Sequence, residues 1–198
     1  MRIGVAAENR AGEKRVILQP PDVNKISSSH EVIVENNAGA GIGITDEDFV
    51  KAGCKIGKKD EVYGAELVLR IKEPSFEEIK LMPAGTIIMS MMHLRCRPKL
   101  EEALHKQKLI AIPLENLKDP LGKRKVEAVE DSGRIGMGYG FKLWGKDPQR
   151  CNVKIMGYGN IAVGAIRCVA RKFARLEILN KKHFLEMHLS YNVYLHYP

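Results

Sequence analysis

Two groups of residues in the 198-residue sequence have types and spacing that could carry chemistry. The first is Gly157-Tyr-Gly-Asn-Ile-Ala162, which lies between a short aliphatic run and a helix-forming stretch. Glycines at its first and third positions allow a tight turn and the close approach of a pyrophosphate, and free amides at the helix N-terminus favour anions. An ordinary glycine-rich turn is the alternative. The candidate cofactor-binding residues here are Gly157, Gly159, Asn160, Ile161 and Ala162.

The end of the next predicted strand bears on the choice of cofactor. Asn180 stands about 20 residues beyond the glycines, where an acidic residue usually accepts a hydrogen bond from a ribose 2′-hydroxyl group. Asparagine does not repel a 2′-phosphate, and Lys181 and Lys182 could pair with one. The pattern therefore predicts NAD or NADP as the cofactor, although these lysines are also typical of a solvated strand end.

The second group lies where predicted strands end. Arg15 follows the first strand, Lys72 the third, His93 the fourth and Glu115 the fifth. The carboxyl ends of parallel strands meet at one edge of the sheet, where ligands bind. Arginine can hold a carboxylate, lysine can donate to a carbonyl oxygen, and histidine can exchange a proton near neutral pH. Together they suit an anionic, carbonyl-bearing small molecule, whereas each taken singly is typical of a surface or capping residue.

The elements that must position these residues alternate between strand and helix, which predicts an α/β fold with a mainly parallel sheet. Thr45-x-x-Asp48 and Ser75-x-x-Glu78 are typical of helix starts. Gly39–Gly43 is interpreted as a flexible turn, because the acidic residues after it would repel phosphate. Short aliphatic runs predict strands at Arg2–Ala7, Glu31–Glu35, Glu66–Ile71, Thr86–Met92 and Leu109–Pro113, and a helix is expected over Pro98–Gln107.

Changes in texture suggest three segments. Residues 1–125 form a Rossmann-like parallel-sheet N-terminal domain that would bind the substrate, and residues 126–151 form a connecting helix or linker. Apolar residues over Val126–Trp144 have helical spacing, but four glycines weaken that prediction. Residues 152–198 begin an incomplete dinucleotide-binding domain with a single βαβ unit, formed by Val153–Met156, Asn160–Ala174 and Leu176–Leu179.

Composition excludes several classes of protein. Apolar residues make up 44% and charged residues 28%, which is too apolar for a disordered chain. No apolar run is long enough to span a membrane, and no secretory signal is seen. The net charge of +8 is spread among lysines and arginines without interleaved aromatics, which favours a solvated surface over a nucleic-acid interface. Four widely spaced cysteines predict reduced thiols in the cytoplasm and no metal site.

Taken in order, several motifs resemble the alanine dehydrogenase / pyridine nucleotide transhydrogenase family. The resemblance covers residues 1–117 and resumes over Val153–Leu179. The motifs are specific in combination, although none is specific alone. They are Arg2-Ile-Gly-Val5, Gly12-Glu-Lys-Arg-Val16, Asn37-Ala-Gly-Ala-Gly41 with Thr45-Asp-Glu-Asp-Phe49, Ala52-Gly53, Arg70-Ile-Lys-Glu-Pro74 and Met92-His-Leu94.

The resemblance implies an NAD-dependent oxidoreductase that reversibly converts an amino acid into a 2-oxo acid. In alanine dehydrogenases, the residues that match Arg15 and Lys72 bind pyruvate, and the histidine that matches His93 serves in acid–base catalysis. The transhydrogenase branch lacks that lysine and histidine, so the amino-acid dehydrogenase side is favoured. That side also includes saccharopine dehydrogenases and carboxyalkyl amino-acid synthases, which join a 2-oxo acid to an amine.

Two departures from the family pattern matter. Asp131-Ser-Gly-Arg-Ile-Gly136 matches only loosely a Ser-x-x-Ala-Gly-Arg stretch of alanine dehydrogenases, so the amino acid is not specified. Family members are longer, carry a catalytically important aspartate in the additional part, and return at their end to complete the first domain. We therefore expect a truncated chain, for which a non-catalytic paralogue that binds nucleotide or assembles with other chains is the alternative. Assembly as a homo-oligomer is left open.

Overall fold

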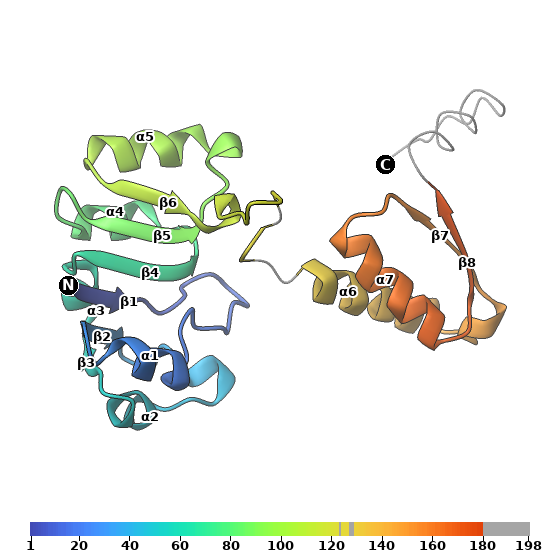
Figure 1. Cartoon of the computed structure of the whole chain (residues 1–198), viewed down its shortest axis with the longest axis horizontal. Helices are drawn as coiled ribbons and strands as arrows, with labels where there is room; N and C mark the ends of the chain where they lie inside the picture. Colours follow the sequence, from blue (N-terminus) through green and yellow to red (C-terminus); the bar gives the residue numbers. More distant parts are fainter. Residues whose placement is uncertain (123, 127–128, 180–198) are drawn as a thin grey trace. The chain divides into compact units, whose positions relative to one another are not determined.

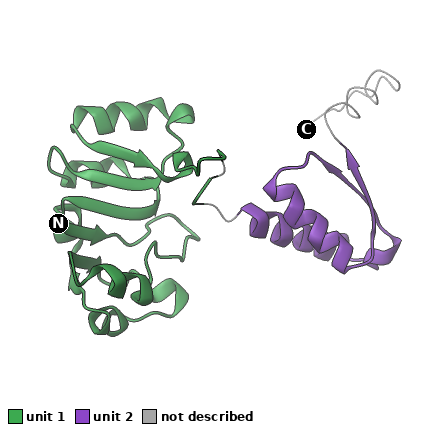
Figure 2. Cartoon of the chain, in the orientation of Figure 1, with its two compact units in different colours: residues 1–126 green, residues 127–198 purple. Residues whose placement is uncertain are grey.

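A computed structural model describes residues 1–122, 124–126 and 129–179 of the chain. The chain forms two compact units, Met1–Val126 and Glu127–Pro198, shown in green and purple in Figure 2. We call them unit 1 and unit 2. Within the described ranges, no helix is long and apolar enough to cross a membrane. The four cysteines are free thiols.

Unit 1 contains a six-stranded parallel sheet (Figure 1). Its strand order is β3-β2-β1-β4-β5-β6, and every neighbouring pair is parallel. This is the doubly wound order of Rossmann-like folds, so the predicted α/β fold class is confirmed. The strands are β1 Arg2–Val5, β2 Glu31–Glu35, β3 Lys55–Gly57, β4 Leu67–Lys72, β5 Ile87–Met91 and β6 Ile110–Pro113.

Five helices flank this sheet, and their apolar residues bury both faces of its central strands. Helices α3, α4 and α5 pack with Val68 of β4 and Ile88 of β5 in one core. Helices α1 and α2 pack with Val5 of β1 and Val34 of β2 in the other. The helices are α1 Pro20–Ile26, α2 Asp46–Lys51, α3 Lys59–Tyr63, α4 Phe76–Leu81 and α5 Pro98–Lys106.

The two predicted helix starts form as expected. The Thr45 hydroxyl accepts a hydrogen bond from the amide of Asp48, and the Ser75 hydroxyl accepts one from the amide of Glu78. In both cases the acidic side chain accepts a hydrogen bond from the backbone amide of the capping residue. The two bonds satisfy amides that the helix itself leaves free. The second of these caps fixes the loop that leaves β4.

The segment Gly39–Gly43 differs from its predicted flexible turn. It contains a 3₁₀ helix, Ala40–Ile42. A Cβ atom on Gly41 would lie only 2.5 Å from the carbonyl oxygen of Lys14, so a side chain would push that loop away. Glycine at this position lets the 3₁₀ helix support the loop that carries Arg15.

Unit 2 contains β7 Asn152–Met156, α7 Asn160–Arg171 and β8 Arg175–Leu179, with β7 and β8 parallel, and helix α6 Val129–Trp144 (Figure 1). The glycines that weakened the helix prediction have a packing role. A Cβ atom on Gly133 would lie 1.9 Å from the carbonyl oxygen of Ile161, and one on Gly164 would lie 1.8 Å from that of Glu130. Glycines therefore let the backbones of α6 and α7 approach closely.

Candidate functional site

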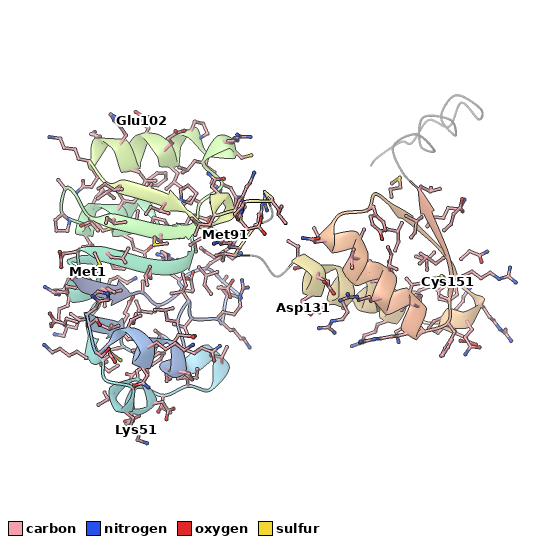
Figure 3. All side chains as sticks on the ribbon, viewed as in Figure 1. Met1, Lys51, Met91, Glu102, Asp131 and Cys151 are labelled. Carbon is pink, nitrogen blue, oxygen red and sulfur yellow. The ribbon has the colours of Figure 1, made fainter. Side chains whose placement is uncertain are left out.

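The candidate site lies at the carboxyl edge of the unit 1 sheet, where the strand order reverses. From β1 the chain proceeds to β2 and β3 on one side, and then returns to β4, β5 and β6 on the other. Such a reversal leaves a crevice beyond the carboxyl ends of the two strands that flank it, here β1 and β4. Figure 3 shows Met91, the last residue of β5, at this edge of the sheet.

The structure brings Arg15 and Lys72 together through Glu13. The guanidinium of Arg15 donates two hydrogen bonds to the Glu13 carboxylate, each 2.7 Å long, from Nε to Oε1 and from Nη2 to Oε2. The Nζ atom of Lys72 lies 4.0 Å from the same Oε2. Glu13 is buried, whereas the side chain of Arg15 is 55% exposed. The carboxylate thus holds two cationic side chains, while the arginine still faces solvent.

This arrangement keeps Glu13 ionised. The hydrogen bond from Arg15 is the main reason why the pKa of Glu13 is lowered to about 2, and it outweighs the burial that would raise this pKa. The pKa of Arg15 is raised chiefly by the same hydrogen bond. At neutral pH Glu13 is therefore an ionised partner shared by two cationic side chains.

An irregularity in β4 determines where Lys72 lies. Leu69 pairs with Met89, but Lys72 pairs with Met91, so β4 has one more residue than β5 between these two pairs. Bulges of this kind turn the side chains that follow them. The carboxylate of Glu8, in the loop after β1, accepts hydrogen bonds from the amides of Ile71 and Lys72, the shortest of them 2.6 Å. Glu8 therefore fixes the backbone of the bulged part of β4.

Beneath this rim lies a buried charge network centred on Arg70, whose side chain is fully buried. Its Nη1 atom donates to the Tyr63 hydroxyl and to Glu78 Oε2, both at 2.6 Å. Its Nη2 atom lies 3.2 Å from Asn9 Oδ1 and 3.5 Å from Glu8 Oε2. The network thus ties the loop after β1 to β4 and to the start of α4.

The charges in this network stabilise one another despite their burial. Burial would raise the pKa of Glu78, but the amide of Ser75, Arg70 and Lys59 together lower it to about 2. Burial would lower the pKa of Arg70, but its neighbours Tyr63, Glu78 and Glu8 raise it. Burial raises the pKa of the Tyr63 hydroxyl group well above its ordinary value. An ionised Arg70–Glu78 pair with a neutral tyrosine is the resulting state.

His93 and Glu115 form a second pair on the same edge. The carboxylate of Glu115, which is buried, accepts hydrogen bonds from the amides of Met92 at 3.1 Å and His93 at 2.5 Å. The imidazole Nδ1 of His93 lies 3.8 Å from Glu115 Oε1, and half of the His93 side chain is exposed. His93 has a left-handed backbone with φ of 49°, which turns the chain sharply at the end of β5.

The two pairs are separate within the part of the chain that the structure describes: no hydrogen bond or ion pair joins Arg15 or Lys72 to His93 or Glu115. A cavity of about 410 Å³ opens beside His93 and Glu115. Both pairs lie beyond strand ends of one parallel sheet, as their spacing predicts. The carboxylate of Glu115 already accepts hydrogen bonds from two backbone amides, so this residue is better placed to orient His93 than to contact a ligand.

The glycine-rich turn of unit 2 lies between β7 and α7. Gly157 has φ of +96°, a conformation that side-chain-bearing residues rarely adopt, and its amide donates to the carbonyl oxygen of Leu179 at 2.7 Å. Gly159 caps α7 with an extended backbone, and a Cβ atom built on it would meet nothing within 4 Å. Ala162 packs against the unit 2 core. The turn is thus tight and open on its outer side.

The remaining predicted cofactor-site residues belong only in part to the described residues. Asn160 and Ile161 lie in the first turn of α7 and line a cavity of about 540 Å³ together with Gly159. Asn180 and Lys181, on which the choice between NAD and NADP rests, lie outside the described residues. The described part of unit 2 contains one βαβ unit.

Several site residues escaped the sequence analysis. Glu13 belongs to the motif Gly12-Glu-Lys-Arg-Val16, and a carboxylate two residues before Arg15 is a signal for a local ion pair. Glu8, Arg70 and Glu78 come from three separate segments, and their convergence depends on the sheet order. Nothing in the sequence alone distinguishes Arg70 from an exposed arginine on a strand.

Comparisons with known proteins agree with this architecture. Residues 4–135 match the family model described as "Alanine dehydrogenase/PNT, N-terminal domain". The chain therefore belongs to the alanine dehydrogenase/PNT family, as its motifs predict. The family model covers the whole carboxyl-edge site of unit 1 and the first residues of α6.

Particular relatives are alanine dehydrogenases. The protein from Bilophila wadsworthia is 29% identical over 201 residues, which cover 93% of this chain and 53% of that protein. The protein from Methanococcus maripaludis is 30% identical over 200 residues, covering 91% of this chain and 53% of that protein. A solved L-alanine dehydrogenase structure matches with a TM-score of 0.82 at 25% identity, covering 96% of this chain and 58% of the other. The chain thus spans about half the length of the curated relatives it matches.

Proposed function

We propose that the chain provides the substrate half of an NAD(P)-dependent oxidoreductase that interconverts an amino acid or imine and a 2-oxo acid. The observation that carries this proposal is the cluster of Arg15, Glu13 and Lys72 beside the β1–β4 crevice. Two cations share one buried carboxylate, and the Arg15 guanidinium remains exposed to solvent and able to bind an anion. The relatives named alanine dehydrogenase support an amino acid as the substrate class.

In this proposal Arg15 holds the carboxylate of the 2-oxo acid. Its Nε and Nη2 atoms are bound to Glu13, which leaves Nη1 and the outer face of the guanidinium for the ligand. Lys72 donates a hydrogen bond to the 2-oxo group and so withdraws electron density from the α-carbon. Glu13 positions both cations and, being ionised, keeps them from repelling each other.

His93 is the proposed general acid–base residue. Its imidazole is half exposed and lines a cavity at the same edge of the sheet, while Nδ1 faces the buried Glu115. A carboxylate behind an imidazole can orient the ring, which leaves the outer nitrogen to exchange a proton with a ligand. Glu115 is a positioning residue in this scheme. The proton moves between His93 and the nitrogen or oxygen atom on the α-carbon of the substrate.

The turn from Gly157 to Ala162 is proposed to bind the pyrophosphate of NAD or NADP. The open space at Gly159 fits this role, because a phosphate can approach the backbone there. The cofactor would supply or accept a hydride at the α-carbon of the substrate. Asn180 and Lys181 are proposed to lie near the adenine ribose, where asparagine tolerates a 2′-phosphate and lysine pairs with it.

Ligand binding to the 198-residue chain tests the substrate site. Pyruvate or oxalate is titrated into isotope-labelled protein, and amide shifts near β1 and β4 are followed by NMR. Arg15→Gln is expected to weaken binding at least about tenfold, because it removes a charge-assisted hydrogen bond. The matched control is Lys25→Gln, because Lys25 is also an exposed cation with a local acidic partner. It lies in the last turn of α1, which leads into β2 at the opposite edge of the sheet. Equal affinities of the wild type and Arg15→Gln would contradict the proposal.

The cofactor site has its own test. Gly159→Val is expected to abolish the binding of NADH and NADPH, measured by calorimetry, while unit 1 resonances stay unchanged. Valine adopts the extended backbone of Gly159 without strain, and its side chain has room in the free protein, so a loss of binding reports steric exclusion of the phosphate. Gly136→Ala, also without neighbours, is the control. Unchanged affinity in Gly159→Val would remove the turn from the cofactor site.

A further inference from the structure

A second cavity of unit 1 has Lys72 among its lining residues. It has a volume of about 820 Å³ and lies between the loop after β1, the loop after β4 and the start of α5. Its walls include the apolar side chains of Pro74, Phe76 and Leu100. Lys72 belongs both to this cavity and to the cluster around Glu13. Lys72 thus links the surroundings of Arg15 to this cavity.

The polar side chains of this cavity are mostly cationic. Arg10, Lys72, Arg97 and Lys99 line it, against the single carboxylate of Glu73. Arg97 forms an ion pair with Glu73 Oε1, and Arg10 Nη1 lies 3.8 Å from the same oxygen atom. Two guanidinium groups thus converge on one oxygen, and each has further N–H donors beyond that contact.

Glu73 itself positions these arginines. Its other oxygen, Oε2, is buried and has no hydrogen-bond partner among the described residues, whereas Oε1 is the oxygen that faces the two arginines. Its pKa is lowered: burial would raise it, but Arg97 and Arg10 more than compensate. The ionised carboxylate neutralises one of the four cations and leaves an excess of positive charge at the rim.

The cavity is larger than a three-carbon 2-oxo acid requires, and its charge favours a second anionic group. We propose that it receives the distal carboxylate of a 2-oxo dicarboxylic acid whose first carboxylate lies on Arg15, with Arg97 and Arg10 as its partners. The methylene groups between the two carboxylates would contact the apolar wall at Pro74 and Phe76. This inference rests on the proposed function and names the substrate class of the same site.

Two ligands of equal length separate the second carboxylate from size. The full 198-residue chain is titrated with 2-oxoglutarate and with 2-oxovalerate, which replaces the distal carboxylate by a methyl group. The wild type is expected to bind 2-oxoglutarate at least about tenfold more tightly, because a hydrogen bond to a charged group is worth about that much. Equal affinities would overturn the proposal. Oxaloacetate, with one methylene group fewer, then reports the distance that the cavity accommodates.

Arg97→Gln locates the effect. It is expected to reduce the preference for 2-oxoglutarate to less than about threefold while the affinity for 2-oxovalerate stays unchanged. Lys106→Gln is the control: it removes an exposed cation in the last turn of α5 that does not line this cavity, and it is expected to leave the preference intact. If both variants fold like the wild type and Arg97→Gln keeps the full preference for 2-oxoglutarate, the assignment of Arg97 is overturned.

Failure of the proposed function gives a different result. If Arg15 does not hold the 2-oxo carboxylate, Arg15→Gln binds both ligands as the wild type does. Succinate, which lacks the 2-oxo group, would then bind as tightly as 2-oxoglutarate through Arg97 alone, and this would overturn the dicarboxylic 2-oxo acid as substrate class. If the proposed function holds and only this inference fails, Arg15→Gln weakens both ligands equally and Arg97→Gln weakens neither.

Discussion

Glu78 gives the sharpest test of the buried charge network. In the variant Glu78→Gln, an amide replaces a carboxylate that accepts hydrogen bonds from Arg70, Ser75, Asn9 and Lys59. Because these partners are donors, the new NH₂ group faces them without an acceptor. Arg70 also loses its closest counter-charge while remaining fully buried. The variant should therefore destabilise unit 1 strongly.

The magnitude follows from the pKa of Glu78. It is lowered from an ordinary 4.5 to about 2, and 2.5 units correspond to about 3 kcal/mol of stability at pH 7. Removing one partner of a buried ion pair typically costs about 3–5 kcal/mol, which agrees. Because the folded-state pKa is the lower one, this stabilisation is complete above about pH 5 and is lost as the pH falls toward 2. At pH 3 about 1.4 kcal/mol of it should remain.

Urea unfolding of the full chain measures this effect. Methyl resonances of Val68 and Ile88 report unit 1, and those of Val169 report unit 2 as an internal reference. Glu77→Gln is the control, since Glu77 is exposed and forms a surface ion pair with Lys80; it should change stability by less than about 0.5 kcal/mol. The free-energy difference between the wild type and Glu78→Gln should shrink by about 2 kcal/mol between pH 7 and pH 3. A pH-independent difference would refute an ionised Glu78.

Three further predictions concern packing and turns. Gly164→Ala places a methyl group 1.8 Å from the carbonyl oxygen of Glu130, so unit 2 should lose its cooperative unfolding in thermal melts followed by Trp144 fluorescence. In the same assay Gly140→Ala, where a Cβ atom meets nothing within 4 Å, should stabilise α6 by about 0.5–1 kcal/mol. Thr45→Ala removes the cap of α2 and should cost about 1 kcal/mol in urea unfolding, whereas Thr45→Ser should retain most of it. Gly157→Ala should destabilise unit 2 by about 1 kcal/mol or more because φ is +96°, and retained stability would contradict the left-handed turn.

The parts of the fold that could be predicted are those with a strong local signal. Strands β1, β2, β4, β5 and β6 are short aliphatic runs, and they lie within one or two residues of their expected bounds. Strand β3 was missed because Lys55–Gly57 has three residues and lies at the edge of the sheet, where it needs little apolar surface. Helices α1 and α3 have seven and five residues, too few to show a helical period.

The candidate site divides in the same way. Arg15, Lys72, His93 and Glu115 could be placed on one edge because parallel strands share a direction, and the positions of strand ends follow from the aliphatic runs. The roles of Glu13, Glu8 and Arg70 could not be predicted, because they depend on which side chains meet across the sheet. Lys72 illustrates the limit: its position at the rim was expected, but the bulge that turns it and the Glu8 carboxylate that holds it are tertiary features.

The strand order also has a consequence for how unit 1 forms during synthesis. Strand β1 is the first to be made, yet it lies in the middle of the sheet, where Ile3 pairs with Val32 on one side and with Leu67 on the other. At about 5–20 residues per second, the ribosome needs roughly 3–13 seconds after β1 before β4 exists. During that time one edge of β1 has unsatisfied backbone groups that can pair with another nascent chain. Closure of this long-range contact, rather than helix formation, should set the folding rate of unit 1.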